Sequence, residues 1–230
     1  MITWNKQTSD WFTDASIYTG FHKSLAQKIK PHLAQSDTLC DIGCGLGRLD
    51  LELSPHVAEI LAIDVSDYAT KTLEQTAKLH NIKNLRVRKD NAEELDGVYD
   101  IILMSLYVPP DIKSLLDHCR RHLIRIVSAG RKSGLYPERH RRDIKNAVPV
   151  AQAELASLGI KYSYEPCSLE FGQPLKTWRD AEQFVLSNAP EAAAGEVTDF
   201  LQKNIHHTPR PDFPYYLPYK KELGIFIITP

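Results

Sequence analysis

The feature that most constrains this sequence is the alternation of short apolar runs with longer amphipathic runs. Within residues 38–128, runs rich in branched aliphatic residues recur, and segments with apolar residues at helical spacing separate them. A parallel sheet with crossover helices produces this pattern, because its strands are buried on both faces. The predicted strands are residues 38–43, 59–64, 84–89, 99–105 and 122–128, and the predicted helices are residues 46–53, 67–80 and 111–121.

The remainder of the chain adds two strands to this sheet. A single α/β domain with a Rossmann-like, seven-stranded, mostly parallel sheet and helices on both faces is therefore expected. The prolines of residues 206–221 predict an extended path without regular structure. The further strands are residues 160–166 and 222–229, and the further helices are residues 145–158, 177–187 and 190–204. The expected parts are an N-terminal helical cap (1–36), a cofactor-binding core (37–170), an insertion (171–221) and a final strand (222–230).

Composition limits which partners and which cellular compartment are expected for this chain. The chain has 28 Lys and Arg against 29 Asp and Glu, so it has no large field that would attract nucleic acid or a membrane surface. No apolar stretch approaches the roughly 18 residues of a membrane span, and the N-terminus lacks a signal-peptide layout, which favours the cytoplasm. The cysteines include no CxxC pair, so neither a disulfide framework nor a metal site is expected.

The most informative segment is DIGCGLG, residues 41–47, between a predicted strand and a predicted helix. Glycines at such a turn let a ligand approach the main chain beside the free amides of a helix N-terminus. The spacing of Gly43, Gly45 and Gly47 is G-x-G-x-G, whereas the dinucleotide fingerprint is G-x-G-x-x-G. Asp41 precedes the turn, and a carboxylate there suits the cationic amino-acid part of S-adenosyl-L-methionine better than a pyrophosphate. The turn therefore favours S-adenosyl-L-methionine over NAD.

Polar groups also follow the next two predicted strands. Asp64 ends the second strand, 21 residues after Gly43, close to the distance expected for an acid that binds ribose hydroxyls. Val65 follows it. Asp90, Asn91 and Ala92 follow the third strand, where the neighbouring base would lie. Three consecutive strand ends therefore carry groups suited to an adenosyl ligand.

These segments resemble the class I S-adenosylmethionine-dependent methyltransferase family. The matching text is DIGCGLGRLDLEL, EILAIDVS, RKDNAEEL and YDIILMSLYVPP, which is similar to the successive cofactor motifs of that family. The resemblance implies an antiparallel last strand and the product S-adenosyl-L-homocysteine. It also implies the positions of cofactor contacts: Gly43, Cys44 and Gly45 at the methionyl part, Asp64 and Val65 at the ribose, Asp90, Asn91 and Ala92 near the adenine, Ser105 and Leu106 at the sulfonium, and Trp11, Phe12 and Tyr18 in a cap over the pocket.

The sequence says less about the methyl acceptor than about the cofactor. The segment SLYVPP, residues 105–110, lacks the Asn or Asp that precedes Pro-Pro in methyltransferases acting on nucleobase or glutamine amino groups, which disfavours such targets. Alignment of a nucleophilic acceptor with the methyl group needs no dedicated base. If a base exists, the candidates are Tyr107, Tyr136 and His140, which lie on loops expected at the active-site edge.

Two further segments are ambiguous. Residues 131–142, RKSGLYPERHRR, either bind an anionic acceptor or form a solvated charged loop. His206 and His207 with nearby aromatic residues are too few ligands for a metal and are expected to pack.

The leading hypothesis is a methyltransferase that acts on a small-molecule acceptor. The alternatives are a non-catalytic module that binds an adenosyl ligand and an RNA methyltransferase. Near-neutral net charge weighs against RNA.

Overall fold

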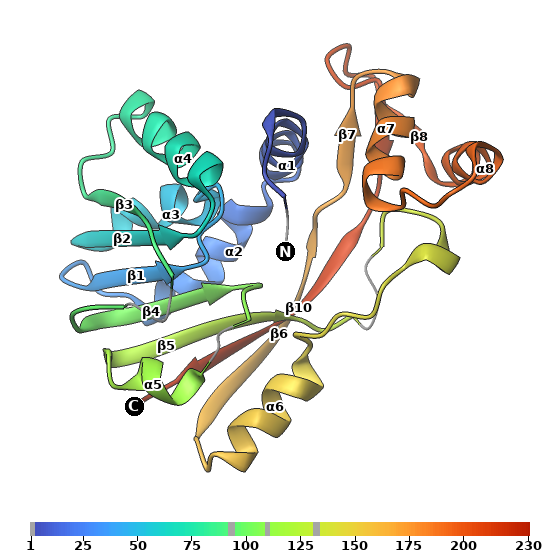
Figure 1. Cartoon of the computed structure of the whole chain (residues 1–230). Coiled ribbons are helices and arrows are strands. Elements are labelled where there is room, and N and C mark those ends of the chain that lie inside the picture. The colour runs from blue at the N-terminus through green and yellow to red at the C-terminus, as the bar shows by residue number, and fades with distance from the viewer. Residues whose placement is uncertain (1–2, 92–94, 109–110, 131–133) are drawn as a thin grey trace.

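The computed structural model describes residues 3–91, 95–108, 111–130 and 134–230. Its centre is a seven-stranded sheet of order β3-β2-β1-β4-β5-β10-β6 (Figure 1). β10 is antiparallel to both of its neighbours, and the remaining pairs are parallel. The strands are β1 (Thr38–Ile42), β2 (Glu59–Asp64), β3 (Leu85–Lys89), β4 (Tyr99–Ser105), β5 (Cys119–Ser128), β6 (Tyr162–Glu170) and β10 (Lys220–Ile228). The predicted Rossmann-like architecture with its antiparallel last strand is confirmed.

Helices cover both faces of this sheet because alternate residues of each strand point to opposite faces. Leu39 and Ile101 belong to one buried cluster, whereas their neighbours Cys40 and Ile102 belong to another. The first cluster packs against α2 (Phe21–Ile29), α3 (Arg48–Leu53) and α4 (Asp67–Leu79), and the second packs against α5 (Ile112–Leu116) and α6 (Val148–Ser157). Short 3-10 helices lie at Lys30–His32, Ser54–His56 and Glu138–His140.

The predicted helix over residues 111–121 is wrong at its end. Asp111 caps α5 by accepting the Lys113 N–H, but the helix stops at Leu116 and β5 starts at Cys119. The Tyr99 N–H donates to the His118 carbonyl, and Arg121 forms an ion pair with the buried Asp37. Sheet pairing with β4 therefore overrides the helical spacing of this segment.

The insertion forms its own small layer. It contains α7 (Trp178–Asn188), α8 (Ala194–Asn204) and a three-stranded antiparallel sheet of order β7-β9-β8. These strands are β7 (Gln173–Leu175), β8 (His206–His207) and β9 (Tyr215–Leu217). The absence of regular structure expected for residues 206–221 is therefore wrong. β9 fits between Pro214 and Pro218, so these prolines flank the ladder rather than interrupt it.

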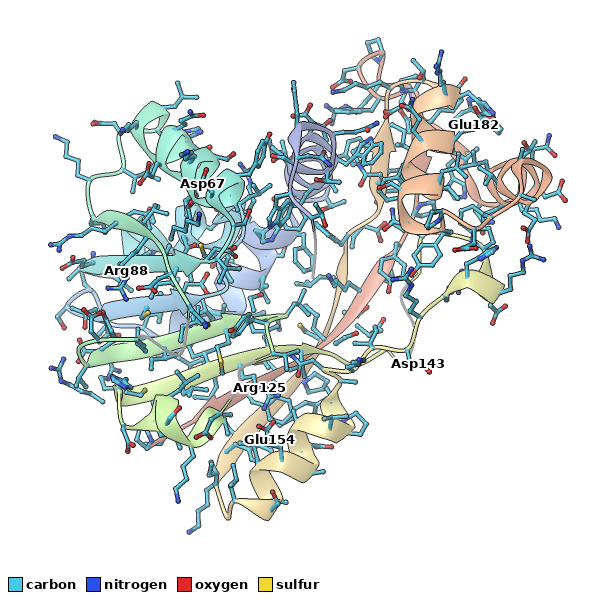
Figure 2. The ribbon with its side chains drawn as sticks, viewed as in Figure 1. Asp67, Arg88, Arg125, Asp143, Glu154 and Glu182 are labelled. Carbon is cyan, nitrogen blue, oxygen red and sulfur yellow. The ribbon has the colours of Figure 1, made fainter. Side chains whose placement is uncertain are left out.

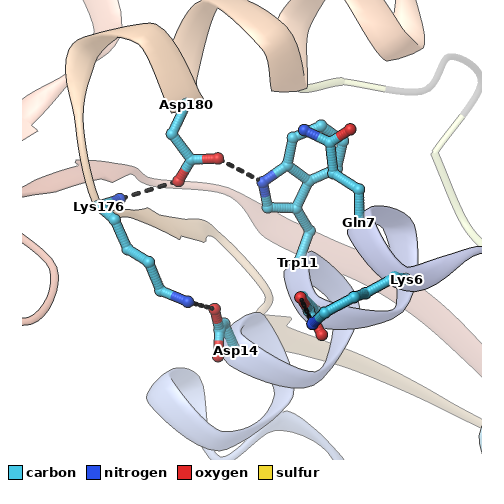
Figure 3. A pocket seen from close by; sticks show the side chains of 7 residues that line it. Lys6, Gln7, Trp11, Asp14, Lys176 and Asp180 are labelled. Atoms are coloured by element: carbon cyan, nitrogen blue, oxygen red, sulfur yellow. Dashed lines mark hydrogen bonds and ion pairs between the residues drawn. The ribbon is translucent and has the colours of Figure 1, made fainter.

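The N-terminal helix α1 (Lys6–Thr19) ties the insertion to the core. The Trp11 indole donates to Asp180 Oδ1 at 2.8 Å, and Gln173 Nε2 donates to the Trp11 carbonyl at 3.0 Å. A cavity of about 260 Å³ lies at this junction (Figure 3). Lys176 bonds to Asp180 through its backbone N–H and to Asp14 through its ammonium group, so the cavity is bridged by an ion pair and hydrogen bonds.

No described helix is long and apolar enough to cross a membrane.

Candidate active site

The turn after β1 has a backbone that favours glycine. Gly43, Gly45 and Gly47 have φ values of 77°, 56° and 62°, in the left-handed region that side chains with a Cβ rarely adopt. The N–H groups of Gly43 and Cys44 donate to the Ile63 carbonyl at 2.8 and 3.0 Å. These bonds hold the turn against the end of β2.

Asp64 lies at the point where this turn meets β2. One carboxylate oxygen accepts the Gly45 N–H at 2.9 Å, and the other accepts the Ser66 N–H at 2.8 Å. A carboxylate oxygen has two lone pairs, so each retains the capacity to accept another hydrogen bond. The exposed Val65 provides an apolar surface beside it. Asp64 is therefore oriented by two backbone groups and can accept from a pair of hydroxyls.

The loop after β3 lies beside the same strand end. The Asp90 N–H donates to the Asp64 carbonyl at 3.1 Å, and the Asn91 N–H donates to Asp90 Oδ1 at 2.8 Å. The Asp90 carboxylate also lies 2.7 Å from Arg88 Nε. Ala92 lies outside the described residues. The structure thus brings Asp90 and Asn91 next to Asp64, with part of the Asp90 charge neutralised by Arg88.

The end of β4 closes the other side of the turn. Leu106 has a φ of 58°, which is unusual for a residue with a branched side chain, and its N–H donates to the Ile126 carbonyl at 2.8 Å. The Tyr107 ring lies against Gly43, because a Cβ built at Gly43 would be 2.5 Å from Tyr107 Cδ2. Ser105 ends β4 directly before this bend. The ends of β1, β2, β3 and β4 therefore converge at one edge of the sheet (Figure 1).

Asp41 lies inside β1 rather than on the surface of the turn. It is buried and faces the fully buried Asp50 of α3. Burial raises the pKa of Asp41 to about 7, and burial with repulsion from Asp41 raises the pKa of Asp50 well above its usual value. This pair therefore holds a proton at neutral pH, which reduces its negative charge beneath the turn.

The aromatic cap differs from expectation. Trp11 packs in the core of the insertion, at 5.3 Å from Phe184, and Tyr18 stacks on Tyr216 at 4.9 Å. The tryptophan at the turn is Trp4, whose ring would lie 3.2 Å from a Cβ at Gly45. Phe12 contacts Trp4 at 5.3 Å. Trp4 precedes α1, so helical periodicity gave no reason to single it out.

Comparison with known proteins agrees with this geometry. Residues 39–125 match the family model described as a methyltransferase domain. Over these residues, the core of this chain is similar to methyltransferase domains. The matched residues run from β1 into β5, which are the strands that carry the converging loops.

Proteins similar to this chain include methyltransferases with different acceptors in their names. A ribosomal protein L11 methyltransferase from Thermotoga petrophila is 25% identical over 103 residues, covering 43% of this chain and 39% of that protein. A protein from Methanococcus maripaludis, named as a cobalt-precorrin-6B C(15)-methyltransferase (decarboxylating), is 30% identical over 99 residues, covering 43% and 55%. The chain thus spans less than two thirds of the length of these curated relatives.

A solved structure shares the fold over a longer range. The YcgJ protein from Bacillus subtilis superposes with a TM-score of 0.54 at 16% identity, covering 89% of this chain and 98% of that chain. The likeness therefore includes the strands beyond β5.

The three residues predicted as candidate bases lie in different places. Tyr136 is buried in the insertion core, and His140 Nε2 lies 3.5 Å from Glu196. Of the three, Tyr107 alone lies against the glycine-rich turn.

The basic segment of residues 131–142 is partly engaged within the fold. Residues 131–133 lie outside the described residues. Arg139 forms an ion pair with Glu196, and Arg141 Nε donates to the Tyr136 carbonyl at 3.1 Å. These contacts hold the segment to the insertion.

Metal ligands are not clustered in the described part of the chain: it contains no group of three or more His, Cys, Asp or Glu that could hold an ion. His206 and His207 instead form β8, and His207 lies 5.2 Å from the Tyr215 ring.

Proposed function

We propose that this chain binds S-adenosyl-L-methionine at the converging ends of β1 to β4 and transfers its methyl group to a small-molecule acceptor. The observation that carries the proposal is Asp64, whose two oxygens are oriented by the N–H groups of Gly45 and Ser66. A carboxylate fixed in this way at the end of a second strand is suited to the two hydroxyls of a ribose. An NAD site would need a G-x-G-x-x-G turn, which the chain lacks.

The residues around Asp64 fit the other parts of such a ligand. Gly43 and Gly45 give the turn its left-handed backbone, and the rings of Tyr107 and Trp4 lie against them, so these two rings would border the methionyl part of the ligand. Val65 and the Asp90–Asn91 loop provide apolar and polar surface beside the ribose position. When bound, the cofactor supplies a methyl group on a positively charged sulfur.

Transfer needs the acceptor atom to be aligned with that methyl group. Alignment converts the encounter into an effectively unimolecular step, and effective molarities of about 10⁵ M or more are typical of well-oriented pairs. The Ser105–Leu106 bend and the Tyr107 ring border the turn, so they orient groups on this side. α1 and the insertion lie beyond the carboxyl ends of the strands and would enclose a small acceptor (Figure 1).

The charges of the chain favour a small acceptor. The formal net charge is −1, and Arg139 and Arg141 of the basic segment are engaged by Glu196 and by a backbone carbonyl. Binding to a nucleic acid draws most of its affinity from unpaired cations that contact phosphates. A small acceptor is therefore favoured over RNA.

Calorimetric titration with S-adenosyl-L-homocysteine, S-adenosyl-L-methionine and NAD tests the cofactor site. We expect micromolar binding of both adenosyl ligands and a loss of about 1.5 to 3 kcal/mol in Asp64→Ala, the range for a hydrogen bond to a charged group. Glu59→Gln is the matched control, because Glu59 starts the same strand and pairs with Arg86 at the surface. Equal affinity of wild type and Asp64→Ala would contradict the assignment.

A measurement of methyl transfer distinguishes an enzyme from a non-catalytic module that binds an adenosyl ligand. Incubation with radiolabelled S-adenosyl-L-methionine and extracted metabolites should label a small molecule. Label on RNA instead would overturn the acceptor class, and tight cofactor binding without label on any fraction would favour the non-catalytic module.

A further inference from the structure

Basic side chains that the cofactor site does not use gather beside α2. The ammonium group of Lys221, near the start of β10, lies 5.2 Å from the Phe171 ring centroid and 5.9 Å from the Phe21 ring centroid. Burial lowers the pKa of Lys221 to about 8, and no carboxylate contributes to this shift. Among the described residues, neither Lys221 nor Arg48 has an ion-pair partner within 4.0 Å. Both side chains are half-buried. A cation held among aromatic rings without an ion-pair partner is costly, which indicates a partner that comes from elsewhere.

His22 lies between these cations and is neutral. Burial, with repulsion from Arg48 and Lys221, lowers the pKa of His22 to about 3. Arg48 Nε donates to Ser16 Oγ at 3.4 Å, and Ser16 Oγ lies 2.7 Å from His22 Nδ1. Because Ser16 accepts from Arg48, its hydroxyl hydrogen can be donated to Nδ1, which leaves the ring hydrogen on Nε2. Lys221, Arg48 and His22 then present donors only.

These donors lie at the same edge of the sheet as the glycine-rich turn. β10 runs opposite to β5 and β6, so its first residues lie where the parallel strands end (Figure 1). Phe171 follows the end of β6, and Arg48 begins the helix that follows the turn. The group is therefore built from segments that are distant in sequence.

A chain of aromatic contacts joins the donors to the turn. Trp4 lies against Gly45, Phe12 lies 5.3 Å from Trp4, and His22 lies 5.3 Å from Phe12. Phe171 lies 5.5 Å from Phe12. Two aromatic rings thus separate the donor group from the backbone that would hold the methionyl part.

We infer that Lys221, Arg48 and His22 bind an anionic group, a carboxylate or a phosphate, carried by the methyl acceptor. The inference rests on the proposed function, because it assigns the acceptor's end of that same site. An anion here would give Lys221 an ion-pair partner and would add a carboxylate or phosphate to Arg48, which otherwise has only the attraction of Glu52. The surrounding rings exclude water and strengthen the attraction. The walls formed by Phe12, Phe21 and Phe171 favour an anion attached to a flat apolar body.

The amino-acid carboxylate of the cofactor is a second source of the same chemistry. The two sources differ in what the loss of Lys221 would change. If the acceptor supplies the anion, Lys221→Met weakens anion binding and leaves S-adenosyl-L-homocysteine affinity unchanged. If the cofactor supplies it, S-adenosyl-L-homocysteine affinity falls.

The experiment uses benzoate and inorganic phosphate as anionic probes and benzamide as the neutral match of benzoate. Each is titrated into the full chain by calorimetry at constant ionic strength, with and without saturating S-adenosyl-L-homocysteine. The variants are Lys221→Met, Lys221→Arg, which keeps the charge, and Lys220→Met, which removes the exposed neighbouring lysine.

We expect benzoate or phosphate to bind wild type, Lys220→Met and Lys221→Arg, and to bind Lys221→Met at least tenfold more weakly. Benzamide should bind at least tenfold more weakly than benzoate. Absence of anion binding to wild type, equal binding of benzamide, or equal anion binding by Lys221→Met would overturn the site. A loss of S-adenosyl-L-homocysteine affinity in Lys221→Met would assign the cations to the cofactor and overturn the acceptor role. If wild type binds benzoate but no adenosyl ligand, the proposed function fails while the anion site stands.

Discussion

The carboxyl groups of Asp41 and Asp50 face each other in the core, one on β1 and the other on α3. Both residues are buried, and one oxygen of Asp41 and both oxygens of Asp50 lack a hydrogen-bond donor in the described structure. Two ionised carboxylates in such a place would repel strongly, so a shared proton is the stable arrangement. The glycine-rich turn is therefore built above a pair of acids whose charge depends on pH.

This pair makes stability depend on pH in a defined direction. The unfolded chain releases these protons near a pKa of about 4, whereas burial raises the pKa of Asp41 in the folded chain to about 7. The folded state then binds more protons between these values, so stability falls as the pH rises through this window. We expect Asp50→Asn to be more stable than wild type at pH 8 by about 1 to 2 kcal/mol, since the amide removes one acid and donates to Asp41. Urea unfolding at pH 5 and pH 8 measures the difference, which should grow with pH.

Asp96→Asn is the control for this comparison. Asp96 is exposed, and its ion pair with Arg88 lowers its pKa, so its loss should not stabilise the fold at pH 8. A lower stability of Asp50→Asn than of wild type at pH 8 would contradict the repulsion between Asp41 and Asp50 on which this prediction rests.

Gly43→Ala tests the contact between the turn and Tyr107. The new Cβ meets both a positive φ of 77° and the Tyr107 ring at 2.5 Å. We expect a loss of about 2 to 4 kcal/mol in the free energy of unfolding, from roughly 1 to 2 for the backbone and the rest for the clash, together with loss of S-adenosyl-L-homocysteine binding.

Gly159→Ala separates the two causes. Gly159 has a φ of 67°, but nothing lies within 4 Å of a Cβ built there, so this variant measures backbone strain alone. If the clash with Tyr107 is real, Gly43→Ala should be the more destabilised, and Tyr107→Ala should restore part of the difference. Equal losses in the two glycine variants would show that the Tyr107 ring moves away at little cost.

The strands of the core could be predicted from the sequence because burial on both faces leaves a continuous apolar signal. β2 and β4 were predicted with their observed ends, and the other strands differ by a few residues. The errors fall where tertiary contacts decide the structure. Pairing of Tyr99 with the segment before β5 shortened a predicted helix, and β9 formed between two prolines that suggested an irregular loop.

The candidate cofactor residues Asp64 and Asp90 could be proposed from the sequence because Asp64 ends β2 and Asp90 directly follows β3. Asp64 and Asp90 lie at strand ends whose positions the apolar runs define. The sequence did not show which aromatic residues of the N-terminal segment lie at the turn, because α1 contacts the core with one face and the insertion with another. Trp11 faces the insertion, whereas Trp4 lies on the turn. The cluster of Lys221, Arg48 and His22 could not be predicted from the sequence, because these residues lie in segments that meet only after folding.

Asn146→Ala tests a polar network that holds the bend after β4. Asn146 Nδ2 donates to the Tyr107 carbonyl at 2.7 Å, and Asn146 Oδ1 accepts from the buried Arg125 at 3.0 Å. Arg125 also forms an ion pair with Glu154 of α6, and Figure 2 shows these two side chains directed toward each other. We expect Asn146→Ala to lower the free energy of unfolding by about 1 to 3 kcal/mol, because a charged donor and a carbonyl lose their partner. Thermal and urea unfolding measure this loss.

The exposed Lys145 provides the control for this network. Lys145→Ala should change stability by less than about 0.5 kcal/mol. If Asn146→Ala leaves the free energy of unfolding unchanged, water replaces the amide without cost and the bend after β4 does not depend on Arg125.

Lys221→Met should stabilise the ligand-free chain. Burial lowers the pKa of Lys221 from 10.5 to about 8, so below pH 8 the folded state carries the full cost of an unpaired cation. Between pH 8 and 10.5 the unfolded chain binds the proton that the folded chain releases, so the stability of wild type rises toward that of the variant. Cation–π contacts with Phe21 and Phe171 act in the opposite direction but contribute only about 0.5 to 1 kcal/mol each. We expect Lys221→Met to be more stable by about 1 to 3 kcal/mol at pH 7 and this gain to shrink by pH 10, as measured by urea unfolding against Lys220→Met. A less stable Lys221→Met at pH 7 would show that the lysine is held for the fold itself, whereas a gain that disappears when benzoate is added would show that the cation is maintained for an anion.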